Sequence, residues 1–124
     1  MKALKILNIY ESLTTLADKD LDLNTAFTIA KNIQSLTVPK RIIEEKRDKL
    51  IQTYAEKDKD GKIRQNKDNT IIFSESNAKE CDKKLTALFN EDINIELAKI
   101  QKSALADIKI SPKLILGLMD ILEE

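Results

Sequence analysis

The sequence predicts an α+β fold in which helices predominate, with one long helix packed against shorter helices and a small antiparallel sheet. Three observations support this. Apolar residues recur at seven-residue steps between positions 29 and 50, several shorter segments have helical spacing, and others alternate between apolar and polar residues. The chain has 124 residues, of which 42% are hydrophobic and 34% are charged. This length and composition predict a single globular domain over residues 1–124.

The first twenty residues predict a short strand followed by a helix. Residues 4–6 alternate between apolar and charged side chains, which is typical of a strand with one buried face. Asn8 and Glu11 then have the spacing of a capping box, in which each side chain binds a free backbone amide of the first helical turn. We therefore expect a helix over residues 9–17, ended by the polar run at 18–20.

A long helix is expected over residues 23–57, with Asp22 or Asn24 as its N-terminal cap. It carries a narrow apolar stripe, close to a coiled-coil seam. The stripe consists of Ile29, Ile33, Leu36, Ile43, Leu50 and Tyr54. Pro39 would normally interrupt a helix, but the stripe keeps its phase on both sides of the proline. One helix, kinked at Pro39, is therefore favoured, and two helices that meet at Pro39 are the alternative.

The length of this helix is the main indication of function. About 35 residues span about 50 Å, whereas a compact globule of this chain length is about 35 Å across. An apolar stripe that extends beyond its own domain needs another surface to cover it. The stripe is thus a candidate interaction surface, either for a homodimer or for another protein. Packing against the strands and short helices of the same chain is an equally weighted alternative.

Three further segments predict the strands of the small sheet. Residues 62–65 and 70–73 are β-prone and flank a four-residue turn at 66–69, a pattern typical of a hairpin. Residues 93–97 alternate between apolar and polar side chains and are the clearest strand in the chain.

Two more helices are predicted from their capping residues. Asn77 and Glu80 repeat the capping-box spacing before a helix over residues 78–90. Near the C-terminus, Ser111 is a cap and Pro112 occupies the first helical position, where its missing N–H costs nothing.

The rare residue types exclude several classes of enzyme. The chain has no histidine, one cysteine and two glycines. Histidine-dependent nucleophiles, imidazole metal sites, internal disulfides and glycine-rich nucleotide loops are therefore excluded. Cys81 shares the apolar register of its predicted helix, so we expect a core residue rather than a reactive thiol. The sequence predicts no catalytic, cofactor-binding or metal-ligating residue, and we interpret the chain as a non-enzyme.

The acidic segment before Gly61 has part of an EF-hand pattern. Glu56, Asp58 and Asp60 stand at loop positions one, three and five. Position twelve is Lys67, where a calcium loop needs a bidentate glutamate. We therefore interpret the segment as the solvated end of the long helix, with Gly61 as its left-handed cap.

Charge and hydropathy bear on location and partners. Lys plus Arg and Asp plus Glu each number 21, so the formal net charge is zero. A nucleic-acid partner is disfavoured because phosphate neutralisation needs excess cations. No apolar run reaches the roughly 18 residues of a membrane span, and the first ten residues lack the apolar core of a secretory signal. We expect a cytoplasmic protein with no membrane partner.

A likeness to a known family extends over nearly the whole chain. Five segments carry it: residues 23–33, 49–54, 85–90, 93–97 and 110–112. In these segments the chain resembles a family of small proteins of unknown function encoded in phages and prophages of Gram-positive bacteria. The resemblance implies a phage context and action in the cytoplasm of the host cell, with a host or phage protein as partner.

The function implied by this context is non-catalytic binding of another macromolecule. A host-directed inhibitor, such as an antagonist of bacterial antiphage defence, is the favoured form. A structural component of the virion or tail is the alternative. Binding or sequestering a small ligand is a third and weaker alternative.

Overall fold

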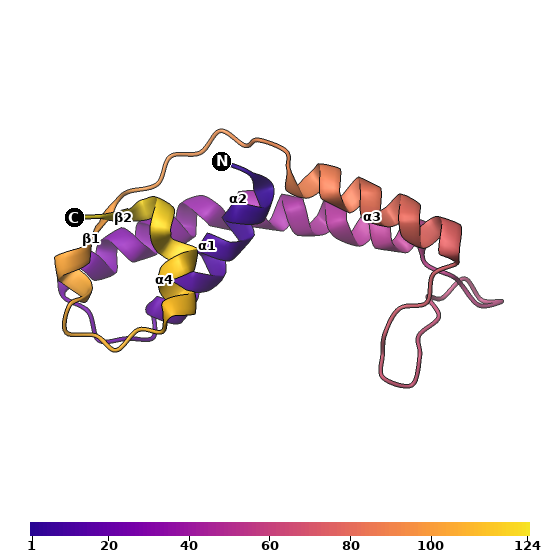
Figure 1. The fold of residues 1–124 in the computed structure, drawn as a ribbon, viewed down its shortest axis with the longest axis horizontal. Helices are drawn as coiled ribbons and strands as arrows, with labels where there is room; N and C mark the ends of the chain where they lie inside the picture. The colour runs from indigo at the N-terminus through magenta and orange to yellow at the C-terminus, as the bar shows by residue number, and fades with distance from the viewer. The chain divides into compact units, whose positions relative to one another are not determined.

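The computed structural model describes residues 1–124, which form two compact units. Unit 1 comprises Met1–Arg41 and Asp92–Glu124, and unit 2 comprises Ile42–Glu91. Helices predominate, as predicted (Figure 1). The elements are α1 (Ala3–Leu16), α2 (Leu23–Tyr54), α3 (Glu75–Phe89), β1 (Ile100–Gln101), the 3₁₀ helix η1 (Lys102–Leu105), α4 (Pro112–Leu118), the 3₁₀ helix η2 (Met119–Ile121) and β2 (Leu122–Glu123). No helix is both long enough and apolar enough to cross a membrane.

α2 confirms the prediction of one long helix. It continues through Pro39, so the alternative of two helices that meet at the proline is wrong. Asp22 is the cap: its Oδ2 accepts a hydrogen bond from the Thr25 N–H at 3.1 Å, and its Oδ1 accepts one from the Thr25 hydroxyl at 2.5 Å. These bonds favour the charged carboxylate and hold the pKa of Asp22 below its usual value.

The C-terminal boundary of α2 differs from the prediction. The helix ends at Tyr54 rather than at residue 57. Glu56 marks the change, because its N–H donates to the carbonyl of Ile72 at 2.9 Å instead of to the preceding helical turn. A contact with a residue distant in sequence therefore sets the end of the helix.

α1 replaces the strand and the shorter helix that the sequence predicts for the first seventeen residues. The helix begins at Ala3 and includes Asn8, so the predicted capping box does not form. One face of α1 is buried, and it consists of Ala3, Ile6, Ile9, Ser12, Leu13 and Leu16. The strand prediction is wrong because the alternation covers only three residues, whereas the helical period covers all fourteen residues of α1.

The sheet of unit 1 is parallel, not antiparallel as predicted. Ile100 of β1 pairs with Leu122 of β2, and Gln101 pairs with Glu123. Figure 1 labels both strands. α4 lies between the two strands in the sequence. A helical crossover brings the second strand back in the direction of the first, which a short hairpin turn does not.

Residues 93–97 do not form the predicted strand, although half-buried and exposed side chains alternate along them. Two hydrogen bonds between the backbones of Met1 and Ile93, of 2.8 and 3.0 Å, hold the start of this segment. Beyond its end, the Asn32 carboxamide binds both the N–H and the C=O of Ala98, each at 2.9 Å. A side chain therefore satisfies backbone groups that a neighbouring strand would otherwise bind.

α4 begins as predicted. The Ser111 hydroxyl accepts a hydrogen bond from the Leu114 N–H at 3.2 Å, and Pro112 is the first helical residue. Leu114 and Leu118 are buried, which directs one face of α4 into the interior of unit 1.

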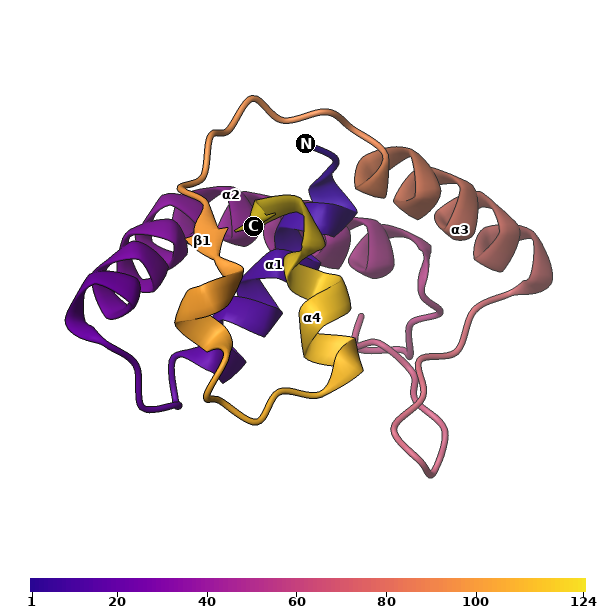
Figure 2. The same ribbon diagram turned by 60° about the vertical axis from the view of Figure 1, so that its left-hand side comes forward.

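In unit 2, α3 lies beside the second half of α2 (Figures 1 and 2). Its cap is Ser74, whose Oγ accepts from the Asn77 N–H at 3.2 Å, so the predicted cap at Asn77 is wrong. Both residue types cap helices well, and the sequence alone does not decide between them. Cys81 is buried, with its Sγ 3.9 Å from the carbonyl oxygen of Leu50.

The predicted hairpin between α2 and α3 is reduced to isolated antiparallel bridges. Lys57 pairs with Ile63, and Gln65 pairs with Ile71, but no continuous strand forms. The turn over residues 66–69 is confirmed, because an N–H···O bond of 2.9 Å joins its last residue to its first.

Candidate functional site

The structure places the predicted interaction stripe largely inside the chain. Ile29, Leu36 and Ile43 are buried. Ile33, Leu50 and Tyr54 are half-buried. The three buried residues therefore pack within their own chain, as the alternative interpretation of the stripe predicted. They are not available to a partner in this conformation.

A second set of apolar side chains lies on the opposite face of α2. Leu23, Phe27 and Val38 are all exposed, Leu23 to 70%. Successive residues of a helix are about 100° apart, which places these three positions on the side away from Ile29 and Leu36. Sequence reasoning missed this face because the heptad spacing of the buried stripe dominates the pattern.

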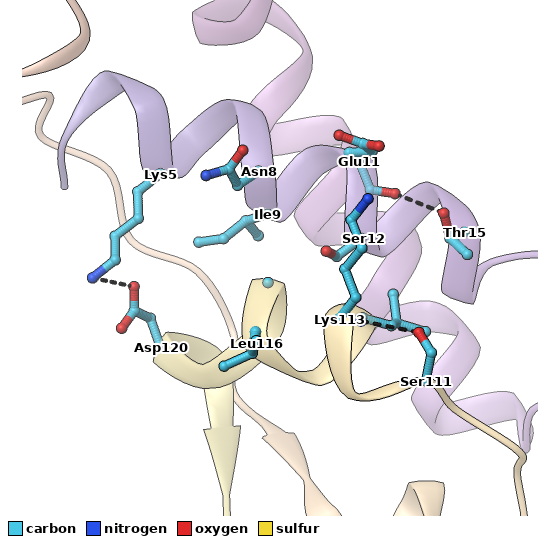
Figure 3. A pocket seen from close by; sticks show the side chains of 12 residues that line it. Lys5, Asn8, Ile9, Glu11, Ser12, Thr15, Ser111, Lys113, Leu116 and Asp120 are labelled. Carbon is cyan, nitrogen blue, oxygen red and sulfur yellow. Dashed lines mark hydrogen bonds and ion pairs between the residues drawn. The ribbon is translucent and has the colours of Figure 1, made fainter.

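A groove of about 470 Å³ between α1 and α4 is the candidate functional site of unit 1 (Figure 3). Side chains from α1 form one wall, and residues from the start of α4 to η2 form the other. The lining residues are Lys5, Asn8, Ile9, Glu11, Ser12, Thr15, Ser111, Lys113, Leu114, Leu116, Gly117 and Asp120. Most of them are polar, although the two helices pack through apolar side chains.

Gly117 determines how closely the two walls approach. A Cβ atom at this position would lie 1.9 Å from the Ser12 Oγ and 3.0 Å from the Ser12 Cβ. Real Cβ atoms do not approach other atoms so closely, so a side chain at this position would displace Ser12. The pair of small residues, Gly117 on α4 and Ser12 on α1, therefore sets the floor of the groove.

One end of the groove is closed by charged side chains (Figure 3). The Lys5 Nζ lies 2.7 Å from the Asp120 Oδ2. Lys99, which does not line the groove, donates from its Nζ to the Asp120 carbonyl oxygen at 2.6 Å. Both side chains of the Lys5–Asp120 pair are more than one-third exposed. Such a pair contributes little to stability, and its effect is to position the two side chains at the end of the groove.

Four polar side chains in the groove have no partner within the chain. They are the Asn8 carboxamide, the Ser12 hydroxyl, the Glu11 carboxylate and the Lys113 ammonium group. The Glu11 backbone carbonyl accepts hydrogen bonds from two threonines, but its carboxylate accepts none. The amide, the anion and the cation are thus free to bind an external group, whereas Ser12 is buried. The groove is chemically suited to recognition by hydrogen bonds and charge.

The structure agrees with the prediction for Cys81 but not with the role predicted for Gly61 in the acidic segment. Burial, and then the nearby charge of Asp82, raise the pKa of the Cys81 thiol, consistent with the predicted core position. The Asp58 carboxylate accepts hydrogen bonds from the N–H groups of Asp60 and Lys62, at 2.9 and 3.0 Å. Gly61 lies within this turn at φ 79°, so its predicted role as the cap of the long helix is wrong.

Comparisons with known proteins add no relative: no family model matches the chain, and no curated protein or solved structure matches it. The function is therefore argued from the groove and from the exposed surface.

Proposed function

We propose that the chain is a non-catalytic protein that acts by binding another protein through the α1–α4 groove and the apolar ridge beside it. The ridge is defined as Ile115, Leu116 and Met119. The observation that carries this proposal is the exposure of the ridge, to 72% at Leu116 and 58% at Met119. Leu116 also lines the groove, so the ridge and the unpartnered polar groups form one continuous surface.

This combination is typical of a protein interface. A few side chains buried at the centre of an interface supply most of the binding energy, and polar groups around them determine orientation. The ridge lies outside the buried face of the same segment, which is formed by Leu114, Leu118 and Ile121. Exposed apolar clusters of this kind commonly mark a binding site.

The biological setting of the proposal comes from the sequence resemblance alone. It favours a phage- or prophage-encoded inhibitor that acts on a host protein in the cytoplasm, such as a component of antiphage defence. A virion or tail component is the alternative. A homodimer would use exposed side chains such as Leu23 and Phe27, because half of the predicted stripe is buried.

Site-directed crosslinking tests the proposed surface. Leu116→Cys is labelled with a benzophenone maleimide and irradiated in a lysate of a Gram-positive host, with Leu23→Cys as the matched exposed control. Cys81 is buried and should not react. We expect Leu116→Cys, and not Leu23→Cys, to crosslink one protein.

The partner identified in this way is then used to measure affinity. We expect Leu116→Asp to weaken binding by about tenfold or more while the circular dichroism spectrum is unchanged, and Leu23→Asp to have little effect. Crosslinking from Leu23→Cys alone would move the interface to the exposed face of α2. Equal loss of affinity in both variants would argue against a defined surface on α4. A crosslinked phage structural protein would support the virion alternative.

A second candidate function, binding of a small polar ligand, is favoured by the size of the same groove. Its volume of about 470 Å³ lies in the usual range for small-molecule sites, about 300–1,000 Å³. A thermal shift with a nucleotide or an amino acid that is lost in Lys113→Met, but kept in Lys102→Met outside the groove, would support this function over the first.

A further inference from the structure

Unit 2 contains a groove of its own, between the second half of α2 and α3. Its volume is about 340 Å³. The lining residues are Lys46, Lys49, Leu50 and Thr53 from α2, and Lys84, Ala87, Leu88 and Glu91 from α3 and the residues directly after it. All of them belong to unit 2, so the groove is complete within this unit.

The groove has an apolar floor and a cationic rim. Leu88 is buried and Leu50 is half-buried, and both line the groove between the two helices. The three lysines of the rim are exposed. Long lysine side chains cover apolar surface with their methylene groups and keep the ammonium group in water.

The ammonium groups of the rim lysines make no ion pair or hydrogen bond within the chain. Other cations of the same helices have partners: Arg47 contacts Asp48 at 3.3 Å, and Lys79 contacts Glu75 at 3.9 Å. Glu91 is the only carboxylate among the lining residues. The groove therefore has an excess of two positive charges, three lysines against one glutamate, in a chain whose formal net charge is zero.

We infer that this groove binds an acidic amphipathic helix of a partner protein. The apolar face of that helix lies on Leu50 and on the exposed Ala87, above the buried Leu88, and its Asp and Glu side chains contact Lys46, Lys49 and Lys84. Two helices side by side, with an apolar seam open on one side, are the usual receptor for a third helix. The lysines select the sign of charge on the incoming helix.

A nucleic acid is less suited to the same groove. A phosphate backbone would pair with the three lysines but would leave the half-buried Leu50 uncovered. Three cations beside Glu91 also supply little of the charge neutralisation on which nucleic-acid binding depends. The apolar floor therefore favours a protein segment over a polyanion.

This inference does not rest on the α1–α4 groove. The two grooves share no lining residue, and the variants that test one leave the other unchanged. Failure of the crosslinking experiment above would not affect the present test, and failure here would leave that proposal intact.

The test measures fluorescence anisotropy of a labelled synthetic helix with the full chain. The probe is a peptide of about 14 residues, or four turns, with leucines at helical spacing on one face and glutamates on its flanks. A sister peptide carries lysines in place of the glutamates. We expect the acidic peptide to bind and the basic peptide to fail, and we expect the affinity to fall as salt rises from about 0.05 to about 0.5 M.

Two adjacent lysines on α3 provide matched variants. Lys84 lines the groove and Lys83 does not, although both are exposed. We expect Lys84→Glu to weaken binding of the acidic peptide by about tenfold, and Lys83→Glu by less than about twofold. Ala87→Trp, which fills the groove without changing charge, should also abolish binding.

Four results would overturn the inference. They are no binding of the acidic peptide, equal binding of both peptides, equal effects of Lys83→Glu and Lys84→Glu, and tighter binding of a labelled DNA duplex than of the peptide. The last result would assign the groove to nucleic acid instead.

Discussion

Position 117 shows how strongly a missing side chain can determine packing. Gly117 allows α4 to rest against Ser12 of α1, since a methyl group there would overlap the Ser12 hydroxyl. We expect Gly117→Ala to lower the free energy of unfolding by about 1–3 kcal/mol, the usual cost of an overpacked contact. Urea denaturation followed by circular dichroism measures the change.

Ser12 supplies the control for this prediction. Its Oγ makes the closest approach, while its Cβ lies at 3.0 Å. Ser12→Ala combined with Gly117→Ala should therefore recover part of the lost stability. If the double variant is as unstable as Gly117→Ala alone, the clash is with the Ser12 Cβ and not with the serine hydroxyl.

Asn32 is a residue whose role the sequence does not indicate. It stands among the apolar residues of α2, where an isolated polar residue reads as a gap in the stripe. The structure buries it and uses its carboxamide to bind the backbone at Ala98. The partner is 66 residues away in the sequence, and local pattern carries no information about a contact of that range.

At the scale of elements, α2 has a buried and an exposed apolar face, and two adjacent isoleucines distinguish them. Ile43 is 2% exposed and Ile42 is 45% exposed. We expect Ile43→Asp to destabilise the fold by about 4 kcal/mol or more, because it buries a charge without a partner. Ile42→Asp should cost less than about 1 kcal/mol.

Thermal unfolding and light scattering of the two variants separate packing from association. If Ile43→Asp remains folded and its oligomeric mass falls, the result would support the stripe as an interface between copies of the chain. An unfolded monomer is the result that its burial predicts.

α3 allows a test of which residue begins a helix. Ser74 caps it and Asn77 lies inside its first turn. We expect Ser74→Ala to cost about 1 kcal/mol, the usual value for a lost N-terminal cap. Asn77→Ala should be neutral or slightly stabilising, since alanine is the better helix former. The reverse order of effects, measured by urea denaturation, would place the helix start at Asn77.

Element type was predictable where the periodic signal was long, and was not where the signal was short. The seven-residue repeat correctly predicts that α2 continues through Pro39. The Ser111 and Pro112 signature correctly predicts the start of α4. Alternation over three to five residues, at positions 4–6 and 93–97, wrongly predicts strands, because a strand also needs a partner that the local sequence does not specify.

For the whole molecule, the ionisable groups predict a flat pH dependence of stability around neutrality. The chain has no histidine, the side chain that ordinarily titrates between about pH 5 and 8. We therefore expect the free energy of unfolding to change little over that range. Chemical denaturation at a series of pH values measures it.

Three shifted pKa values define the limits of this range. Hydrogen bonds from Thr25 and Thr70 lower the pKa values of Asp22 and Asp68. These two carboxylates stabilise the fold at pH values above the pKa of an aspartate in the unfolded chain, about 3.9. This stabilisation is lost as the pH falls through their lower pKa values in the folded chain. Burial raises the pKa of Cys81, so its contribution is present below the unfolded value, about 8.5, and is lost as the pH rises through the folded value. A marked change near pH 6.5 would contradict this prediction.

The residues of the α1–α4 groove were predictable only in part from the sequence. From the sequence, Asn8 and Glu11 are capping residues and Ser12 and Lys113 have no assigned role. The structure brings all four to one groove. Only the packing of α4 on α1, from opposite ends of the chain, could place them together.

The sequence by itself determined the predominance of helices, the continuity of α2 and the exclusion of histidine chemistry, because composition and long periodicity are local properties. The tertiary structure decided which apolar face of α2 is buried, the parallel direction of the small sheet and the position of both grooves. These depend on contacts between residues far apart in the chain, whose free energy appears only when the helices have packed.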